Sequence, residues 1–168
     1  MEQLNEIIAE RKSCRCYLDK EISDEEIKIL LESARWAPSG KNGQPWRFVV
    51  VKDKKIKSRV ASYSIYESWM KNASAFIIVY LDKQKSYNYK KDIQGIGATI
   101  ENISLQATYM GFGSCWIGEI LDNEYYVNTI LGVPDNYELM AVLCIGYAKK
   151  EEKRTGRLEV KDIVYRYL

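Results

Sequence analysis

The sequence contains no histidine among its 168 residues. Catalysis that pairs a serine or cysteine nucleophile with an imidazole base is therefore excluded, and so are metal sites with imidazole ligands. The Cys14-x-Cys16 pair has neither the usual C-x-x-C spacing nor a second cluster behind it, so we expect no metal ion. Chemistry near neutral pH would need another proton carrier or a bound cofactor.

Long apolar runs are also lacking. The run over residues 75–81 has the length of a strand, far short of a membrane-spanning helix, so we expect no membrane partner. The N-terminal residues are acidic and polar, unlike a secretory signal, and the four cysteines lack a disulfide-type spacing. We therefore expect reduced thiols in a cytoplasmic protein.

The charges nearly cancel. There are 25 Lys and Arg against 23 Asp and Glu, which gives a net charge of +2 and no indication of a nucleic-acid partner. Hydrophobic residues make up 46% of the chain, enough for one core, although a large cofactor pocket would have to be shared with a partner chain. The sequence contains no internal repeat and no linker, so residues 1–168 are predicted to form a single domain.

The apolar spacing predicts helices that alternate with strands. The Ser23-x-x-Glu26 capping box starts one helix, and Pro38 ends it. Residues 38–46 are a loop by composition, and residues 83–91 are expected to be the most mobile segment. We expect helices over residues 1–11, 24–37, 53–61, 93–110 and 123–131 with a short one within 62–74, and strands over 47–51, 75–81, 114–117 and 139–147. This order indicates an α/β or α+β layered fold.

The last residues are unusual for a compact domain. Residues 149–168 begin with a basic stretch, trail after the last predicted strand and end in an alternating apolar segment. Docking of this tail onto a partner chain would explain it.

One basic segment is a candidate binding site. Residues 11–15 (R-K-S-C-R) place three cations and a hydroxyl at a helix end. Converging donors of this kind suit a phosphate, but a solvated basic end that complements the helix dipole is the commoner case. The glycine pairs at 95/97 and 111/113 complete neither a dinucleotide fingerprint nor a P-loop. The four Trp and 13 Tyr either fill the core or wall a flat ring system.

Four segments, in this order, resemble the FMN-dependent nitroreductase family. Residues 11–15 are similar to its R-x-S-x-R phosphate motif, and residues 37–46 (A-P-S-G-K-N-G-Q-P-W) to its A-P-S-x-x-N-x-Q-P-W loop. Residues 97–107 and 111–118 resemble its central helix and the strand behind the flavin. Arg157-Leu158 and the apolar residues that follow resemble its C-terminal motif. The resemblance spans nearly the whole chain.

The resemblance implies a fold and a cofactor. The expected fold is α+β and three-layered, with a central, mostly antiparallel sheet flanked by helices. The C-terminal segment is expected to be exchanged with the partner subunit of a homodimer, and FMN to lie at the subunit interface. By the resemblance, the cofactor-binding residues are Arg11, Lys12, Ser13, Arg15, Pro38, Ser39, Asn42, Gln44, Ile117, Gly118 and Arg157.

The same resemblance gives these residues roles. Arg11, Ser13 and Arg157 are expected to bind the FMN phosphate together with Lys12, and Arg15 to lie near N1 and O2 of the flavin. Pro38, Ser39 and Asn42 are expected to reach the ring from the other subunit. The backbone at Ile117-Gly118 is expected to direct an amide toward N5. No side chain is expected to be catalytic.

The implied activity is that of an oxidoreductase. NADH or NADPH would pass a hydride through flavin N5 to a small-molecule acceptor, nitroaromatic or quinone, in ping-pong order. That chemistry suits a protein without histidine, because the flavin carries the hydride and solvent supplies protons. In the family, a helical segment often covers the flavin pocket, and in this sequence that segment is reduced to residues 62–91. An alternative is therefore a flavin-binding or storage module without NAD(P)H turnover, or a specialised flavin reductase or dehalogenase on the same scaffold.

Overall fold

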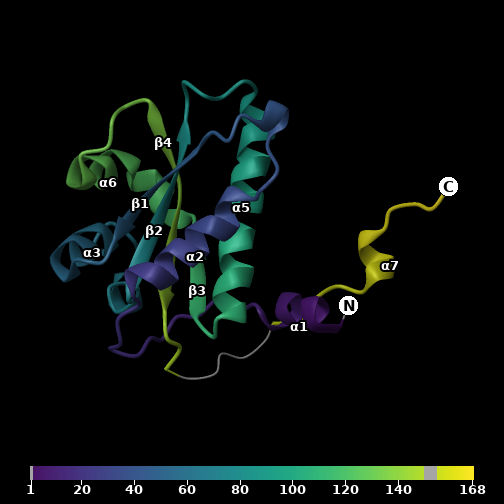
Figure 1. Cartoon of the computed structure of the whole chain (residues 1–168), viewed down its shortest axis with the longest axis horizontal. Coiled ribbons are helices and arrows are strands. Elements are labelled where there is room, and N and C mark those ends of the chain that lie inside the picture. Colours follow the sequence, from purple (N-terminus) through teal and green to yellow (C-terminus); the bar gives the residue numbers. More distant parts are fainter. Residues whose placement is uncertain (1, 150–154) are drawn as a thin grey trace.

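The computed structural model describes residues 2–149 and 155–168 and places a four-stranded sheet at the centre of the molecule (Figure 1). The strands are β1 (Trp46–Val51), β2 (Ala75–Asp82), β3 (Gly113–Ile117) and β4 (Tyr137–Gly146), in the order β1-β2-β4-β3. Every pairing in the sheet is antiparallel. Together with the flanking helices, this confirms the predicted α+β class.

Helices cover both faces of the sheet. The helical elements are α1 (Glu2–Glu10), α2 (Asp24–Arg35), α3 (Lys54–Ala61), α4 (Glu67–Met70), α5 (Tyr89–Tyr109), α6 (Glu124–Leu131) and α7 (Val160–Ile163), with 3-10 turns η1 (Gly40–Asn42) and η2 (Glu119–Asn123). The α2 and α5 helices lie on one face (Figure 1). The α3, α4 and α6 helices lie on the other. The three-layer prediction is confirmed.

The β2 strand explains why the layers hold together. All eight of its residues are buried. Ile77 and Val79 pack into the core beneath α2 and α5, whereas Phe76 and Ile78 pack into the opposite core. Alternate side chains of a strand point to opposite faces, so a continuous apolar run is what a strand covered on both sides requires.

The α2 helix begins at the predicted capping box. The Glu26 amide donates to Ser23 Oγ over 3.2 Å, and the Ser23 amide donates back to Glu26 Oε2 over 2.7 Å. The hydrogen bonds from Ser23 lower the pKa of Glu26 below its usual value. The box fixes where the chain enters the helix that covers α5.

This box leads to a pH prediction. Because the pKa of Glu26 is lower in the folded state, its contribution to stability is complete above the unfolded-state pKa of about 4.3 and is lost as the pH falls through the folded value. We expect Glu26→Gln to flatten the acid limb of the stability curve, and Ser23→Ala to cost about 1 kcal/mol at pH 7. Urea unfolding at several pH values measures both. An unchanged acid limb in Glu26→Gln would contradict the assignment.

The start of α5 differs from the sequence prediction. The α5 helix begins at Tyr89, not near residue 93, because Asn88 Oδ1 caps it by accepting from the Lys91 amide. The buried Asp92 carboxylate accepts from the Ser86 hydroxyl and from the amides of residues 87 and 88. The end of the segment expected to be most mobile is therefore helix, and the residues before it are held by hydrogen bonds.

The tail extends from the body of the molecule, and α7 lies within it (Figure 1). Leu158, Val160 and Ile163 are each at least 65% exposed. Such apolar side chains fit a segment that docks elsewhere, but its exchange with a partner subunit remains a prediction. Of the tail that begins at Lys149, residues 150–154 lie outside the described residues.

Candidate functional site

The basic segment is attached to the outer edge of the sheet. The α1 helix ends where the Arg11 amide donates to Ile7 O, and the next residues run along β3. Ser13 forms a parallel bridge with Ser114, and the Cys14 amide donates to Ser114 O over 2.8 Å. The segment therefore has a fixed backbone, unlike a solvated helix end.

Contacts from outside the segment hold this backbone. The Tyr17 hydroxyl donates to Cys14 O over 2.8 Å, and burial raises the pKa of Tyr17 well above its usual value, so the phenol stays a neutral donor. Gly113 lies so close that a Cβ there would be 2.5 Å from Cys14 Sγ. No local sequence pattern indicated either contact.

Arg11 is oriented by a carboxylate on α5. Its Nε lies 3.2 Å from Glu101 Oε1, and its side chain is only 25% exposed. An arginine has five N–H donors in a planar fork, so an ion pair through Nε leaves the Nη groups able to bind an anion. Arg15 is exposed beside this segment, with an Nη1 contact of 3.5 Å to Ser13 O.

The C-terminal end of β3 is open at Gly118. Ile117 is buried, but Gly118 is exposed, and a Cβ at Gly118 would meet no atom within 4 Å. Trp116, on the same strand, is 49% exposed. A planar ring can pack against a strand end whose backbone and indole side chain are both exposed.

The loop after α2 has a strained backbone. Lys41, Asn42 and Gln44 all have φ between +46° and +54°, a region that non-glycine residues enter rarely. Ser39 Oγ accepts from the Gln44 amide over 3.1 Å, which closes the loop. Strain of this kind is typical of functional segments. Pro38 is exposed at the start of the loop.

This loop and the basic segment pack on the same helix. Pro38 O would lie 3.2 Å from a Cβ at Gly95, close to the start of α5, whereas Arg11 pairs with Glu101 further along. The structure brings Arg11, Lys12, Ser13 and Arg15 together in one segment beside β3, and holds Pro38, Ser39, Asn42 and Gln44 together in the other.

Arg157 lies in the tail and bonds to its chain neighbours. Its Nη1 donates to Thr155 O over 3.2 Å and to Thr155 Oγ1 over 3.0 Å, within the projecting tail. Its role in holding a phosphate remains a prediction.

Neither a metal site nor a membrane span is found in the part of the chain that the structure describes. No three Cys, Asp or Glu side chains within residues 2–149 and 155–168 are placed to hold a metal ion. Over the same residues, no helix has the length and apolar character needed to cross a bilayer.

Comparison with known proteins identifies the family. The profile of the Nitroreductase family matches residues 8–65 and 62–147. An Archaeoglobus fulgidus protein named as an NADH dehydrogenase/NAD(P)H nitroreductase is 37% identical over 90% of this chain and 89% of its own. The chain therefore belongs to the nitroreductase family.

Solved structures agree with this assignment. A Desulfovibrio desulfuricans protein described as a nitroreductase in complex with FMN superposes with a TM-score of 0.93 and 29% identity, over 98% of this chain and 96% of its own. An FMN-dependent nitroreductase from Clostridium difficile gives a TM-score of 0.84 at 29% identity, over 96% and 98% of the two chains.

Proposed function

We propose that this member of the nitroreductase family, an FMN-dependent NAD(P)H oxidoreductase, reduces nitroaromatic or quinone-type acceptors in ping-pong order. The support comes from one juxtaposition: the basic segment is paired with β3 at Ser114, and the exposed Gly118 directly follows the last residue of the same strand. At about 3.3 Å per residue, four residues separate these points by roughly 13 Å. A phosphate at one end and a ring at the other fit that distance.

The donor set fits FMN. Arg11, Lys12 and Ser13 would hold the phosphate, which carries about two negative charges, and Arg157 would join them in the assembled protein. Arg15 would place positive charge at the pyrimidine edge of the ring, where it stabilises negative charge. The Gly118 amide, next to the buried Ile117, would orient the ring without adding a group that titrates.

Bound FMN would supply hydride acceptance and donation, which no side chain of this protein can do. The residues of the chain then bind, orient and exclude water. None is required as a general acid or base, because solvent protons suffice for the acceptor. The nicotinamide and the acceptor use one open face in turn, which is the basis of the ping-pong proposal.

The decisive experiment is spectroscopic. We expect the purified protein to be yellow, to bleach anaerobically with NADH or NADPH, and to recolour when a nitroaromatic is added. Initial rates at varied donor and acceptor should give parallel double-reciprocal lines. Colourless protein that takes up no added FMN would refute the proposal. FMN binding without steady-state NAD(P)H oxidation would favour a flavin-storage module.

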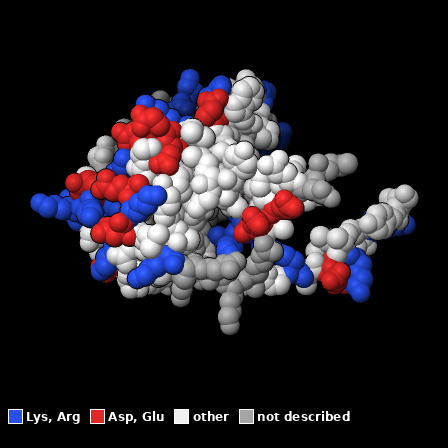
Figure 2. Space-filling view, turned by 60° about the horizontal axis from the view of Figure 1, so that its bottom comes forward, with Lys and Arg blue, Asp and Glu red and all other residues white. Residues whose placement is uncertain are grey.

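The proposed site also needs a second chain. The apolar side chains of the tail are exposed, and Figure 2 shows a broad uncharged area in the middle of the main body. We propose a homodimer in which each tail docks on the partner and the loop at Pro38, Ser39, Asn42 and Gln44 faces the partner's flavin.

Light scattering tests the dimer directly. We expect a particle of about 39 kDa, twice the 19.5 kDa of one chain, and a monomer after deletion of residues 157–168. The deletion should also remove bound FMN, because the interface and Arg157 are lost together. A dimer that persists with full FMN content after the deletion would show that the tail is not required.

A further inference from the structure

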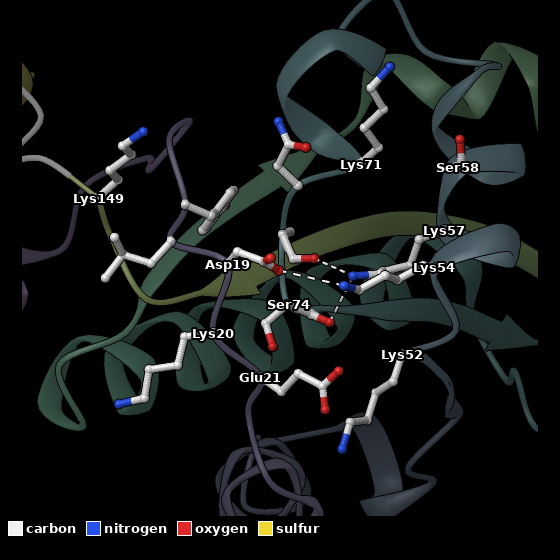
Figure 3. A pocket seen from close by; sticks show the side chains of 14 residues that line it. Asp19, Lys20, Glu21, Lys52, Lys54, Lys57, Ser58, Lys71, Ser74 and Lys149 are labelled. Atoms are coloured by element: carbon white, nitrogen blue, oxygen red, sulfur yellow. Dashed lines mark hydrogen bonds and ion pairs between the residues drawn. The ribbon is translucent and has the colours of Figure 1, made fainter.

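A pocket lined by lysines lies outside the proposed flavin site. It is formed by residues 17–21, the start of α3, the turn at 71–74 before β2, and Lys149, and its volume is about 630 Å³ (Figure 3). None of the residues proposed to hold FMN lines it. The pocket is concave and within the size range of small-molecule sites.

The charge of this lining far exceeds that of the chain. Two carboxylates line the pocket, Asp19 and Glu21, against six ammonium groups, so the lining carries a net charge of +4 in a chain of net +2. The six lysines, contributed by four separate segments, are Lys20, Lys52, Lys54, Lys57, Lys71 and Lys149. The fold therefore brings lysines from separate parts of the chain together in this pocket.

The floor of the pocket is fixed. Lys57 is 4% exposed, and its Nζ donates to Ala73 O and, over 2.9 Å, to Ser74 O. Ser74 Oγ in turn accepts from the Ile22 amide over 2.7 Å. Figure 3 shows the ammonium groups of Lys54 and Lys57 directed toward the middle of the pocket. A buried ammonium thus ties the turn at residue 74 to α3.

The lysines are only weakly neutralised. Burial, and after it the positive charge of nearby Lys54, lowers the pKa of Lys57. Lys54 Nζ lies 3.6 Å from Asp19 Oδ1, and that carboxylate is 95% exposed. The pairs of Lys52 with Asp24 and Lys71 with Glu67 also lie at the surface. Exposed pairs contribute little stability, so a bound anion can displace them.

We propose that this pocket binds a small polyanion, an organic molecule that carries two phosphate groups. A phosphate carries about −1.5 to −2 charges at neutral pH, so two of them match the net +4 of the lining. Lysine suits such a ligand as a mobile point charge. The concave shape favours a small molecule over a nucleic acid or an acidic protein, which would need an extended basic surface.

Inorganic pyrophosphate is the probe, titrated calorimetrically into FMN-saturated protein at low ionic strength, with orthophosphate as the single-phosphate comparison. Saturation with FMN keeps the probe from the basic segment at Arg11. We expect one pyrophosphate per chain, bound about tenfold more tightly than orthophosphate. If the protein holds no FMN, the same titration with Arg11→Ala separates this pocket from the proposed flavin site.

The variants are matched in charge. Lys54→Gln with Lys71→Gln should weaken pyrophosphate binding about tenfold or more and leave NAD(P)H oxidation unchanged. Lys55→Gln with Lys90→Gln, two exposed lysines outside the pocket, should change binding less than about twofold. Both pairs leave Lys57 and the fixed floor intact, and their melting temperatures check the fold.

Three results would overturn the proposal. The first is no saturable pyrophosphate binding. The second is equal weakening in both double variants, which would indicate only the overall charge of the protein. The third is tighter, pocket-dependent binding of heparin or a short DNA duplex than of pyrophosphate, which would assign the surface to a macromolecule.

Discussion

Arg11→Ala should weaken FMN binding by about 1.5–3 kcal/mol, roughly ten- to 150-fold in the dissociation constant. Arg11 is the described arginine whose guanidinium is both partly buried and oriented, through Glu101, beside the strand that carries Ser114. Removing it takes away a charge-assisted, geometrically fixed donor to the phosphate. Fluorescence titration of FMN with apoprotein measures the change.

The control separates binding from folding. Arg59→Ala removes an exposed arginine of α3, far along the chain from the basic segment, and should leave FMN affinity unchanged. The Arg11–Glu101 pair is itself partly exposed, so Arg11→Ala should shift the urea midpoint little. Equal FMN affinity in wild type and Arg11→Ala would show that the phosphate lies elsewhere.

Gly113→Ala should damage the same site without touching a charged group. The added Cβ would lie 2.5 Å from Cys14 Sγ and 2.6 Å from Cys14 Cβ, so the basic segment must move away from β3. Overpacking of this kind costs about 1–3 kcal/mol. We expect a lower urea midpoint together with weaker FMN binding, because the backbone that positions Ser13 moves.

Arg59→Ala is the control here as well, because its side chain is exposed on α3, outside the proposed site. It should change neither quantity. If Gly113→Ala binds FMN as wild type does, the close approach of the two segments has no part in the site. If it binds FMN less well only in proportion to its unfolded fraction, the effect is on stability alone.

The sequence alone predicts helices and strands correctly wherever a local pattern determines them. The uninterrupted apolar run of β2 could only be a strand buried on both faces, and the Ser23–Glu26 spacing located the start of α2. The cap at Asn88 was overlooked because the polar residues around it also fit a loop. The boundary of α5 was wrong for that reason.

In the candidate site, motifs predict the residues but not the contacts that hold them in place. Its residues were named from motifs, but the contacts that hold them connect positions far apart along the chain. Gly113 packs against Cys14 from 99 residues further along the chain, and Glu101 reaches Arg11 across 90 residues. No spacing rule contains such pairs. The part that Arg157 plays in the site remains a prediction from its motif.

The pairing of Ser13 with Ser114 has a consequence beyond ligand binding. An outermost strand with unsatisfied amides invites other chains to add to it, and proteins commonly protect such strands with a covering segment. Here residues 13 and 14 provide that protection for β3. A change that detaches them would uncover the strand as well as disable the site, so loss of activity and a tendency to aggregate should arise from the same event.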